Sequence, residues 1–244
     1  VLIDITKDAQ FELFDYEYSK CKGIRSYNPL PKINSSSIDD AVRLINKAKK
    51  PFIVWGQGVI LGNAEDEFKS FVEKSGIPAA WTILGVSALP TSHELNVGMV
   101  GMHGNYGPNL LTNECDLLVA IGMRFDDRVT GDPKTYANQA KIIHLDIDPA
   151  EINKNIKVEV PIIGDCKESL KLITEKIEKR SHEKWISKFD DLMKIEFDKV
   201  INSDLNPSKK GLTMGESIIA INEQTNGEAI IVTDVGQHQM VACR

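Results

Sequence analysis

The sequence has 244 residues and a formal net charge of −6, which is enough chain for one large core or two smaller ones. The acidic balance and the lack of any Lys- and Arg-rich segment exclude a general nucleic-acid surface, and no apolar run approaches the roughly 18 residues of a membrane span. The first residues carry no signal-peptide pattern and the cysteines form no C-x-x-C pair, so we expect a cytoplasmic protein with reduced thiols.

The first 35 residues predict the end of one folding unit, followed by a linker. Val1 to Ile5 reads as a strand with nothing before it to pair with, and residues 11–31 are irregular and polar. A helix is expected next, because Ser35 to Ser37 can cap it and Pro51 can end it. Its apolar residues recur on one face: Ile38, Ala41, Val42, Ile45 and Ala48.

A predicted strand at residues 52–55 and a helix near residues 63–75 form a βα unit around a glycine turn. Gly56-Gln57-Gly58 begins a G-x-G-x-x-x-G pattern that ends at Gly62, one residue longer than the dinucleotide-binding fingerprint. The next predicted strand, residues 79–82, is not followed by the acidic residue that would bind a ribose. The pattern therefore fits a tight strand-to-helix turn better than a nucleotide site, although the nucleotide site stays open.

Residues 84–113 form a long segment without hydrophobic periodicity, containing glycines at positions 85, 98, 101, 104 and 107. Loops of this length inside a compact domain are usually functional or disordered. The mixture of Met99, Met102, His103 and Tyr106 with these glycines favours an ordered loop that faces a ligand. A short helix, residues 108–115, should close the segment.

The most informative stretch runs from Leu117 to Gly131. Its first five residues, LLVAI, predict a strand buried on both faces, as in a parallel sheet, and Gly122 then allows a ligand to approach the backbone closely. Two arginines and two aspartates follow within six residues: Arg124, Asp126, Asp127 and Arg128. Because ligands bind at the carboxyl ends of strands in open α/β sheets, the two guanidinium groups suit a phosphate-bearing ligand. A solvated loop whose charges pair with each other is an equally good interpretation.

Two further strands are expected at residues 141–145 and 158–163. Asp146 ends the first and could accept a hydrogen bond from a ribose or base, although an aspartate in a turn is as common. Asp148 could cap a short helix that begins at Pro149. The second strand leads into Gly164-Asp165-Cys166 and a helix that extends to about Lys179.

The last part of the sequence predicts a long amphipathic helix over residues 181–202 and a polar linker at residues 206–210. Thr213 and Glu216 form a capping box for another helix. Residues 229–233 read as a strand, followed by a turn, and the chain stops as a helix would be starting.

These elements predict one α/β domain at residues 36–180, built on a doubly wound, Rossmann-like parallel sheet. Residues 1–35 and 181–244 are expected to be stubs of two flanking domains. Because both ends read as half-built βα units, we expect the chain to be a piece of a longer protein.

Several runs of residues resemble the catalytic chain of the acetolactate synthase family, also called acetohydroxyacid synthases. They are VGMVGMHGNYGPN, IGMRFDDRVTG, IIHLDIDPAEINKN, the GD at 164–165 and VGQHQM at 235–240. The run IGMRFDDRVTG is highly specific, whereas the glycine turn alone is not. The resemblance extends from Val1 to about Met240 and so covers nearly the whole chain.

The resemblance implies the end of a pyrimidine-binding domain in residues 1–35, the central FAD-binding domain in residues 36–180 and the start of a diphosphate-binding domain in residues 181–244. It implies an enzyme that uses thiamine diphosphate and Mg2+ to condense pyruvate with a second 2-ketoacid, pyruvate or 2-ketobutyrate, with loss of CO2, in branched-chain amino acid biosynthesis. FAD would be structural. A homodimer or tetramer with a small regulatory subunit is implied. The catalytic glutamate and the magnesium motif belong to the outer domains, so this chain alone is expected to be inactive.

The resemblance also implies which residues contact the cofactors. For FAD they are Gly56, Gly58, Thr82, Ile83, Met102, His103, Gly104, Gly122, Arg124, Asp126, Arg128, Asp146, Asp165 and Cys166. Arg124 would face the pyrophosphate, and Asp146, Asp165 and Cys166 would lie near the adenosine. The turn at the thiamine diphosphate phosphates would comprise Val235, Gly236, Gln237 and His238. No catalytic residue or metal ligand is implied within this chain.

Two positions depart from the family pattern: the linker at residues 27–31 lacks an arginine that some relatives place there for FAD, and Val241 replaces a usual Trp. Another thiamine diphosphate enzyme, of pyruvate oxidase or glyoxylate carboligase type, is the main alternative, but the Arg-Phe-Asp-Asp-Arg run favours acetolactate synthase. A sirtuin-type enzyme would need paired cysteines for zinc, and an interaction module would need no ligand at all. His103 and His238 are interpreted as polar loop residues and not as general bases.

Overall fold

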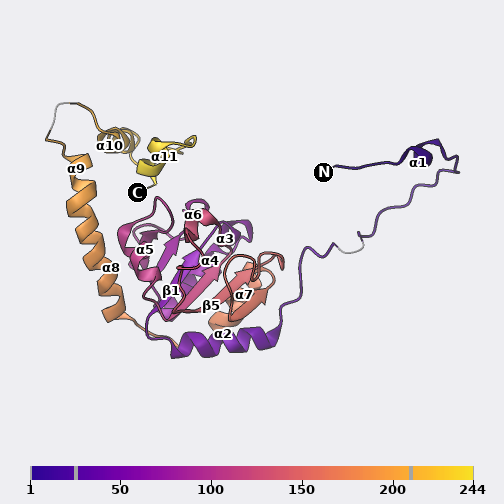
Figure 1. The fold of residues 1–244 in the computed structure, drawn as a ribbon, viewed down its shortest axis with the longest axis horizontal. Helices are drawn as coiled ribbons and strands as arrows, with labels where there is room; N and C mark the ends of the chain where they lie inside the picture. Colours follow the sequence, from indigo (N-terminus) through magenta and orange to yellow (C-terminus); the bar gives the residue numbers. More distant parts are fainter. Residues whose placement is uncertain (1, 25–26, 209–210, 244) are drawn as a thin grey trace.

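The computed structural model describes residues 2–24, 27–208 and 211–243. Figure 1 shows an α/β domain with a long helix along one side and an N-terminal segment that extends away from it. The strands are β1 (Pro51–Trp55), β2 (Ala79–Trp81), β3 (Asn96–Met99), β4 (Leu117–Ile121), β5 (Lys141–Asp146) and β6 (Val160–Ile163). The helices of the domain are α2 (Ser35–Lys47), α3 (Gly58–Leu61), α4 (Glu65–Ser75), η1 (Ile83–Gly85), α5 (Tyr106–Thr112), α6 (Asp127–Thr130) and α7 (Cys166–Lys176).

The remaining helices lie before and after the domain: α1 (Lys7–Phe11), α8 (Glu183–Glu196), η2 (Phe197–Ile201), α9 (Asn202–Leu205), α10 (Met214–Gln224) and α11 (Gln237–Ala242). The predicted helix at residues 181–202 is found as the run α8, η2 and α9, in which η2 is a π-helical segment. No helix in the described ranges is both long and apolar enough to cross a membrane.

The six strands form one sheet in the order β3-β2-β1-β4-β5-β6, and every neighbouring pair is parallel. The chain builds outward from β1 through β2 to β3, then returns to the centre and builds outward in the other direction from β4. This order is that of a doubly wound Rossmann-like fold, which confirms the predicted fold class. It places the reversal point between β1 and β4, in the middle of the sheet.

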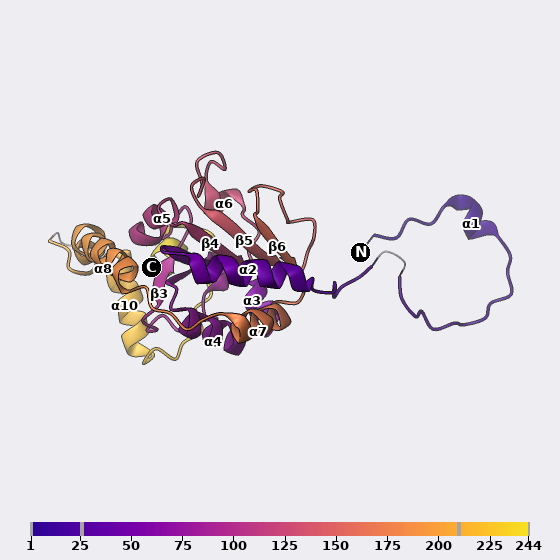
Figure 2. The ribbon, with the colours of Figure 1, turned by 90° about the horizontal axis from the view of Figure 1, so that it is seen from below.

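Each face of the sheet is covered by its own core, because successive residues of a strand point to opposite faces. On the first face Ile53, Val119 and Ile143 pack against α2, α4 and α7. On the second face Val54 and Ala120 pack with α5, the start of α8 and the loops after β4 and β5. Figure 2 shows α4 and α7 on one side of the sheet and α5 on the other. Both faces are therefore dry, which explains the uninterrupted apolar runs of β1 and β4.

Helix ends follow the expected chemistry with two differences. The capping box of α10 is confirmed, since Thr213 Oγ1 accepts from the amide of Glu216 and the Glu216 carboxylate accepts from the amide of Thr213. In α2 the cap is Asn34 and not one of the serines. Pro51 does not end α2, which stops at Lys47, but begins β1.

The structure contains elements that the sequence pattern did not predict. β3 lies inside the segment expected to be a loop, because its four residues include Asn96 and Gly98 and so lack a strand-like pattern. The one-turn helices α3 and α6 follow β1 and β4. Conversely, no helix begins at Pro149: Asp148 Oδ1 accepts from the amide of Ala150 within a series of turns.

Two predicted strands at the ends of the chain are wrong. Residues 2–5 and 229–233 form no strand, and their apolar side chains are exposed, Leu2 at 94% and Ile230 at 92%. A strand is stable only when it pairs with another, and neither segment belongs to the six-stranded sheet. Val1 lies outside the described residues, as do Lys209 and Lys210 of the predicted second linker.

Candidate functional site

A cleft of about 1070 Å³ lies at the carboxyl ends of the central strands. It includes residues that follow β1, β2, β4, β5 and β6, together with parts of the loop after β3. The chain after β1 enters α3 and α4 on the first face, whereas the chain after β4 turns to the second face, so a crevice opens between them. The volume is that of a site for a sizeable ligand.

Most of the predicted cofactor-binding residues line this cleft. They are Gly56, Gly58, Thr82, Ile83, Met102, His103, Gly122, Arg124, Asp126, Arg128, Asp146, Asp165, Cys166 and Val235. Four others do not line it: Gly104, Gly236, Gln237 and His238. A Cβ on Gly104 would lie 2.5 Å from the carbonyl oxygen of Met99, so this glycine is required by its own turn.

The two glycine turns on either side of the reversal point interlock. The amide of Gly56 donates to the carbonyl of Ile121 (2.9 Å), and the amide of Gly58 donates to the carbonyl of Gly122 (3.0 Å). A Cβ on Gly58 would lie 2.5 Å from the Cα of Gly122, and a Cβ on Gly56 would collide with the Gly122 carbonyl oxygen. These glycines therefore allow backbone to meet backbone, and in doing so they leave the floor of the cleft without side chains.

Arg124 and Arg128 lie on the turn that follows β4, residues 123–128, here called the arginine turn. The side chain of Asp126 organises this turn, because its Oδ1 accepts from the amide of Arg128 (3.0 Å) and caps α6, while its Oδ2 pairs with Arg124 Nε (3.2 Å). Asp127 is exposed and lies outside the cleft lining. Of the two adjacent aspartates, only Asp126 lines the cleft, while Asp127 is the first residue of α6.

The Arg124 side chain is 71% exposed and lines the cleft although it is paired through Nε. Within the described ranges no ion pair involves Arg128, which is also exposed and lines the cleft. A guanidinium group has five N–H donors in a planar fork, so one contact through Nε leaves its outer edge able to bind an anion. The arrangement puts two cations in the lining of the same cleft as the glycine turns.

The loop of Met102 and His103 is fixed against the arginine turn by backbone contacts. The amide of Met102 donates to the carbonyl of Arg128 (2.7 Å), and Asn109 holds both backbone groups of Gly101 at 2.8 Å. The predicted ligand-facing loop is therefore ordered, and Met102 is 59% exposed at the rim of the cleft.

The opposite end of the cleft is acidic. Asp146 Oδ1 accepts from the amide of Asp148 (2.9 Å), and Asp165 Oδ1 accepts from the amide of Glu168 (2.9 Å), which caps α7. Glu151 also lines this end: its Oε1 pairs with Lys154 (2.7 Å), whereas its Oε2 is buried without a hydrogen-bond partner among the described residues. The cleft thus has a cationic middle and an end rich in hydrogen-bond acceptors.

Other lining residues were also missed by sequence reasoning. They are Leu30, Gln57, Leu61, Gly62, Leu84, Val100, Met123, Val129, Leu145, Ile147, Gly164, Gln239 and Met240, whereas Met99 belongs to the loop predicted to face a ligand. Most are apolar and lie beside the predicted positions, so no chemical signal distinguished them from core residues. Glu151 could have been suspected from its place five residues after Asp146, on the same loop. No cluster of three or more metal-ligating side chains occurs in the described part of the chain.

Cys166, at the acidic end, is expected to resist alkylation. Burial raises the pKa of its thiol to about 12, and the negative charge of Asp165 adds to the shift, so the reactive thiolate is scarce at pH 8. Iodoacetamide at pH 8 should modify exposed Cys21 and leave Cys166 unmodified until the chain is unfolded in urea, as followed by peptide mass spectrometry. Cys115, buried outside the cleft with its pKa also raised to about 12, should behave like Cys166. Equal labelling rates for Cys21 and Cys166 would contradict this assignment.

Comparison with known proteins shows which family the chain resembles. Residues 38–173 match the family model described as "Thiamine pyrophosphate enzyme, central domain". The acetolactate synthase large subunit of Corynebacterium glutamicum is 40% identical over 100% of this chain and 39% of its own length. The probable acetolactate synthase large subunit of Methanococcus aeolicus is 40% identical over 98% of this chain and 43% of its own length. The chloroplastic acetolactate synthase of Arabidopsis thaliana is 38% identical over 100% of this chain and 37% of its own length. The chain therefore spans about two fifths of the length of these relatives.

Proposed function

Because the chain belongs to the thiamine pyrophosphate enzyme family and carries its central domain, we propose that it is the central part of an acetolactate synthase large subunit and binds FAD in the cleft. The observation that carries the proposal is the arrangement of the arginine turn and the glycine turns around one crevice at the reversal point of the sheet. In doubly wound folds this crevice is where dinucleotides bind.

The chemistry of the cleft fits the parts of FAD in order. Arg124 and Arg128 supply cationic donors for the pyrophosphate, and the floor at Gly58 and Gly122 lets the pyrophosphate approach the backbone. The carboxylates of Asp146 and Asp165, together with the unpartnered Oε2 of Glu151, supply acceptors for ribose hydroxyl groups or the adenine amino group.

The flavin ring would then lie toward the rim. Thr82 and Ile83 line one side of the cleft near its rim, and the loop of Met102 and His103 lines another side. This region offers both apolar and polar groups, as an amphipathic ring system requires. In this proposal FAD has a structural role and takes no net part in electron transfer.

The whole protein would condense pyruvate with a second 2-ketoacid, pyruvate or 2-ketobutyrate, with loss of CO2, in branched-chain amino acid biosynthesis. Thiamine diphosphate, held with Mg2+, would supply the carbanion chemistry. In this chain the segment Val235, Gly236, Gln237 and His238 is proposed to approach its phosphates. The chain alone should be inactive, because the proposed division assigns the catalytic glutamate and magnesium motif to other domains.

The proposed division has three parts: residues 1–35 end the pyrimidine-binding domain, 36–180 form the FAD-binding domain and 181–244 begin the diphosphate-binding domain. The central part agrees with the span of the family match. A small regulatory subunit is proposed for the whole protein, since two of the relatives described above are named large subunits. A homodimer or tetramer and a cytoplasmic location are proposed with it.

A flavin titration of the purified chain tests the proposal. FAD should bind with a micromolar or lower Kd, observed as quenching of flavin fluorescence, whereas FMN should bind at least about tenfold more weakly because it has neither the pyrophosphate nor the adenosine. NAD serves as the control for a site that accepts any dinucleotide, and it should not displace FAD. Equal affinities for FAD and FMN, or no binding of either, would refute the assignment.

A further inference from the structure

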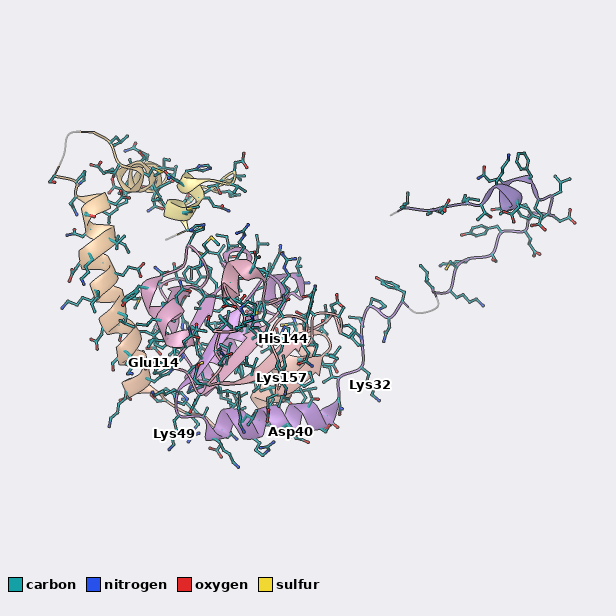
Figure 3. The ribbon with its side chains drawn as sticks, in the orientation of Figure 1. Lys32, Asp40, Lys49, Glu114, His144 and Lys157 are labelled. Carbon is teal, nitrogen blue, oxygen red and sulfur yellow. The ribbon has the colours of Figure 1, made fainter. Side chains whose placement is uncertain are left out.

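A fully buried histidine lies beneath the cleft, in a position that the family resemblance and the sequence pattern did not single out. His144 is the fourth residue of β5 and is 0% exposed. It lies two residues after Ile142, so both side chains point to the second face of the sheet. Figure 3 labels His144 in the interior of the domain.

The imidazole ring of His144 is joined to the arginine turn by a short hydrogen bond. Its Nε2 lies 2.7 Å from the carbonyl oxygen of Met123, and because a carbonyl can only accept, Nε2 carries the proton and donates it. The same nitrogen lies 3.6 Å from Oδ2 of Asp146, a residue of the acidic end of the cleft.

His144 also contacts the residue on the other side of Arg124. Phe125 packs edge-on against the imidazole with a centroid distance of 4.9 Å, and against Tyr136 at 6.1 Å. Phe125 has a φ of +50°, a left-handed conformation that a bulky residue adopts only when its surroundings impose it. The backbone of Arg124 is therefore held on both sides by residues that contact His144.

We infer that His144 is a positioning residue that directs the guanidinium of Arg124 into the cleft. Met123, Arg124 and Phe125 are consecutive, so a shift of the Met123 carbonyl or the Phe125 ring changes the direction in which the Arg124 side chain leaves the backbone. Among the residues that the structure describes, the exposed guanidinium pairs only with Asp126, so its direction depends on this buried support. The inference rests on the proposed binding of a pyrophosphate-bearing ligand.

A double-mutant cycle tests the inference with FAD and the full 244-residue chain. His144→Leu, which removes the donor, should raise the Kd for FAD about tenfold, while His144→Gln, whose amide nitrogen reaches about as far as Nε2, should stay within about threefold of wild type. In an Arg124→Ala background His144→Leu should change the Kd by less than about twofold, because the residue through which it acts is gone. Circular dichroism at the binding temperature confirms that each variant is folded.

Additive effects of His144→Leu and Arg124→Ala would overturn the inference, since they would show that His144 acts only on general stability. If His144→Leu does not fold, His144→Asn replaces it: its amide is too short to reach Met123, so a Kd equal to that of His144→Gln would overturn the inference. If the wild type binds inorganic pyrophosphate but not FAD, the proposed function fails and the same cycle is run with pyrophosphate. If the wild type binds neither FAD nor pyrophosphate, both the proposed function and the inference about His144 are wrong.

Discussion

Gly122→Ala is expected to lower the free energy of unfolding by about 3–5 kcal/mol. Gly122 has a φ of +58°, where a Cβ is strained, and that Cβ would lie 2.6 Å from the Cα of Gly58 and 2.9 Å from the amide nitrogen of Val59. All of these atoms are backbone, so the collision can be relieved only by separating the two central βα turns. Urea denaturation followed by circular dichroism measures the loss.

Gly131→Ala is the matched control. Gly131 has a φ of +59° and lies just beyond the arginine turn, but a Cβ there would meet nothing within 4 Å. Because Gly131 also has a ψ of −127°, outside the left-handed helical region, the substitution should cost only backbone strain, about 1–3 kcal/mol. If the two substitutions destabilise the chain equally, the interlocking of the glycine turns contributes nothing beyond conformational strain, and the account of the cleft floor is wrong.

Replacing both Arg124 and Arg128 by alanine is expected to raise the Kd for FAD about 100-fold or more. Each hydrogen bond from a charged donor to a phosphate contributes about 1.5–3 kcal/mol, and both guanidinium groups line the cleft. The wild-type Kd should increase with NaCl concentration, and this salt dependence should nearly disappear in the double variant, because the screened cations are absent. Flavin fluorescence titration at several salt concentrations measures both effects.

Arg43→Ala controls for the loss of an exposed arginine. Arg43 on α2 pairs with Asp40 at 2.9 Å and is 54% exposed, much like Arg124, but it does not line the cleft. Its removal should leave the Kd for FAD unchanged. An equal loss of affinity in Arg43→Ala would show that net charge, and not the position of the arginine turn, governs binding.

The central strands and the arginine turn could be predicted because a strand that is buried on both faces appears in the sequence as an uninterrupted apolar run. β4 has the predicted bounds, since Leu117 to Ile121 face dry cores on either side and any polar residue there would be costly. Arg124, Asp126 and Asp146 were likewise found because polar side chains directly after a buried strand must lie at its carboxyl end.

Features that depend on contacts distant in sequence could not be predicted. β3 forms because residues 96–99 pair with β2 in the sheet. Residues 229–233 have a better strand pattern, but they pair with no strand that the structure describes. The steric role of Gly122 became visible only when Gly58 was placed beside it. The support given by His144 was hidden for the same reason, since nothing in the run IIHLD indicates that its histidine donates to Met123, 21 residues earlier.

The central claim is that FAD binds with its pyrophosphate between the arginine turn and the glycine turns. A crystal structure of the chain with FAD bound tests it most directly. The account predicts a pyrophosphate oxygen within about 3.2 Å of the Arg124 guanidinium, with the adenosine at the acidic end beside Asp146 and Asp165. A pyrophosphate placed elsewhere, with Arg124 contacting only Asp126, would contradict it.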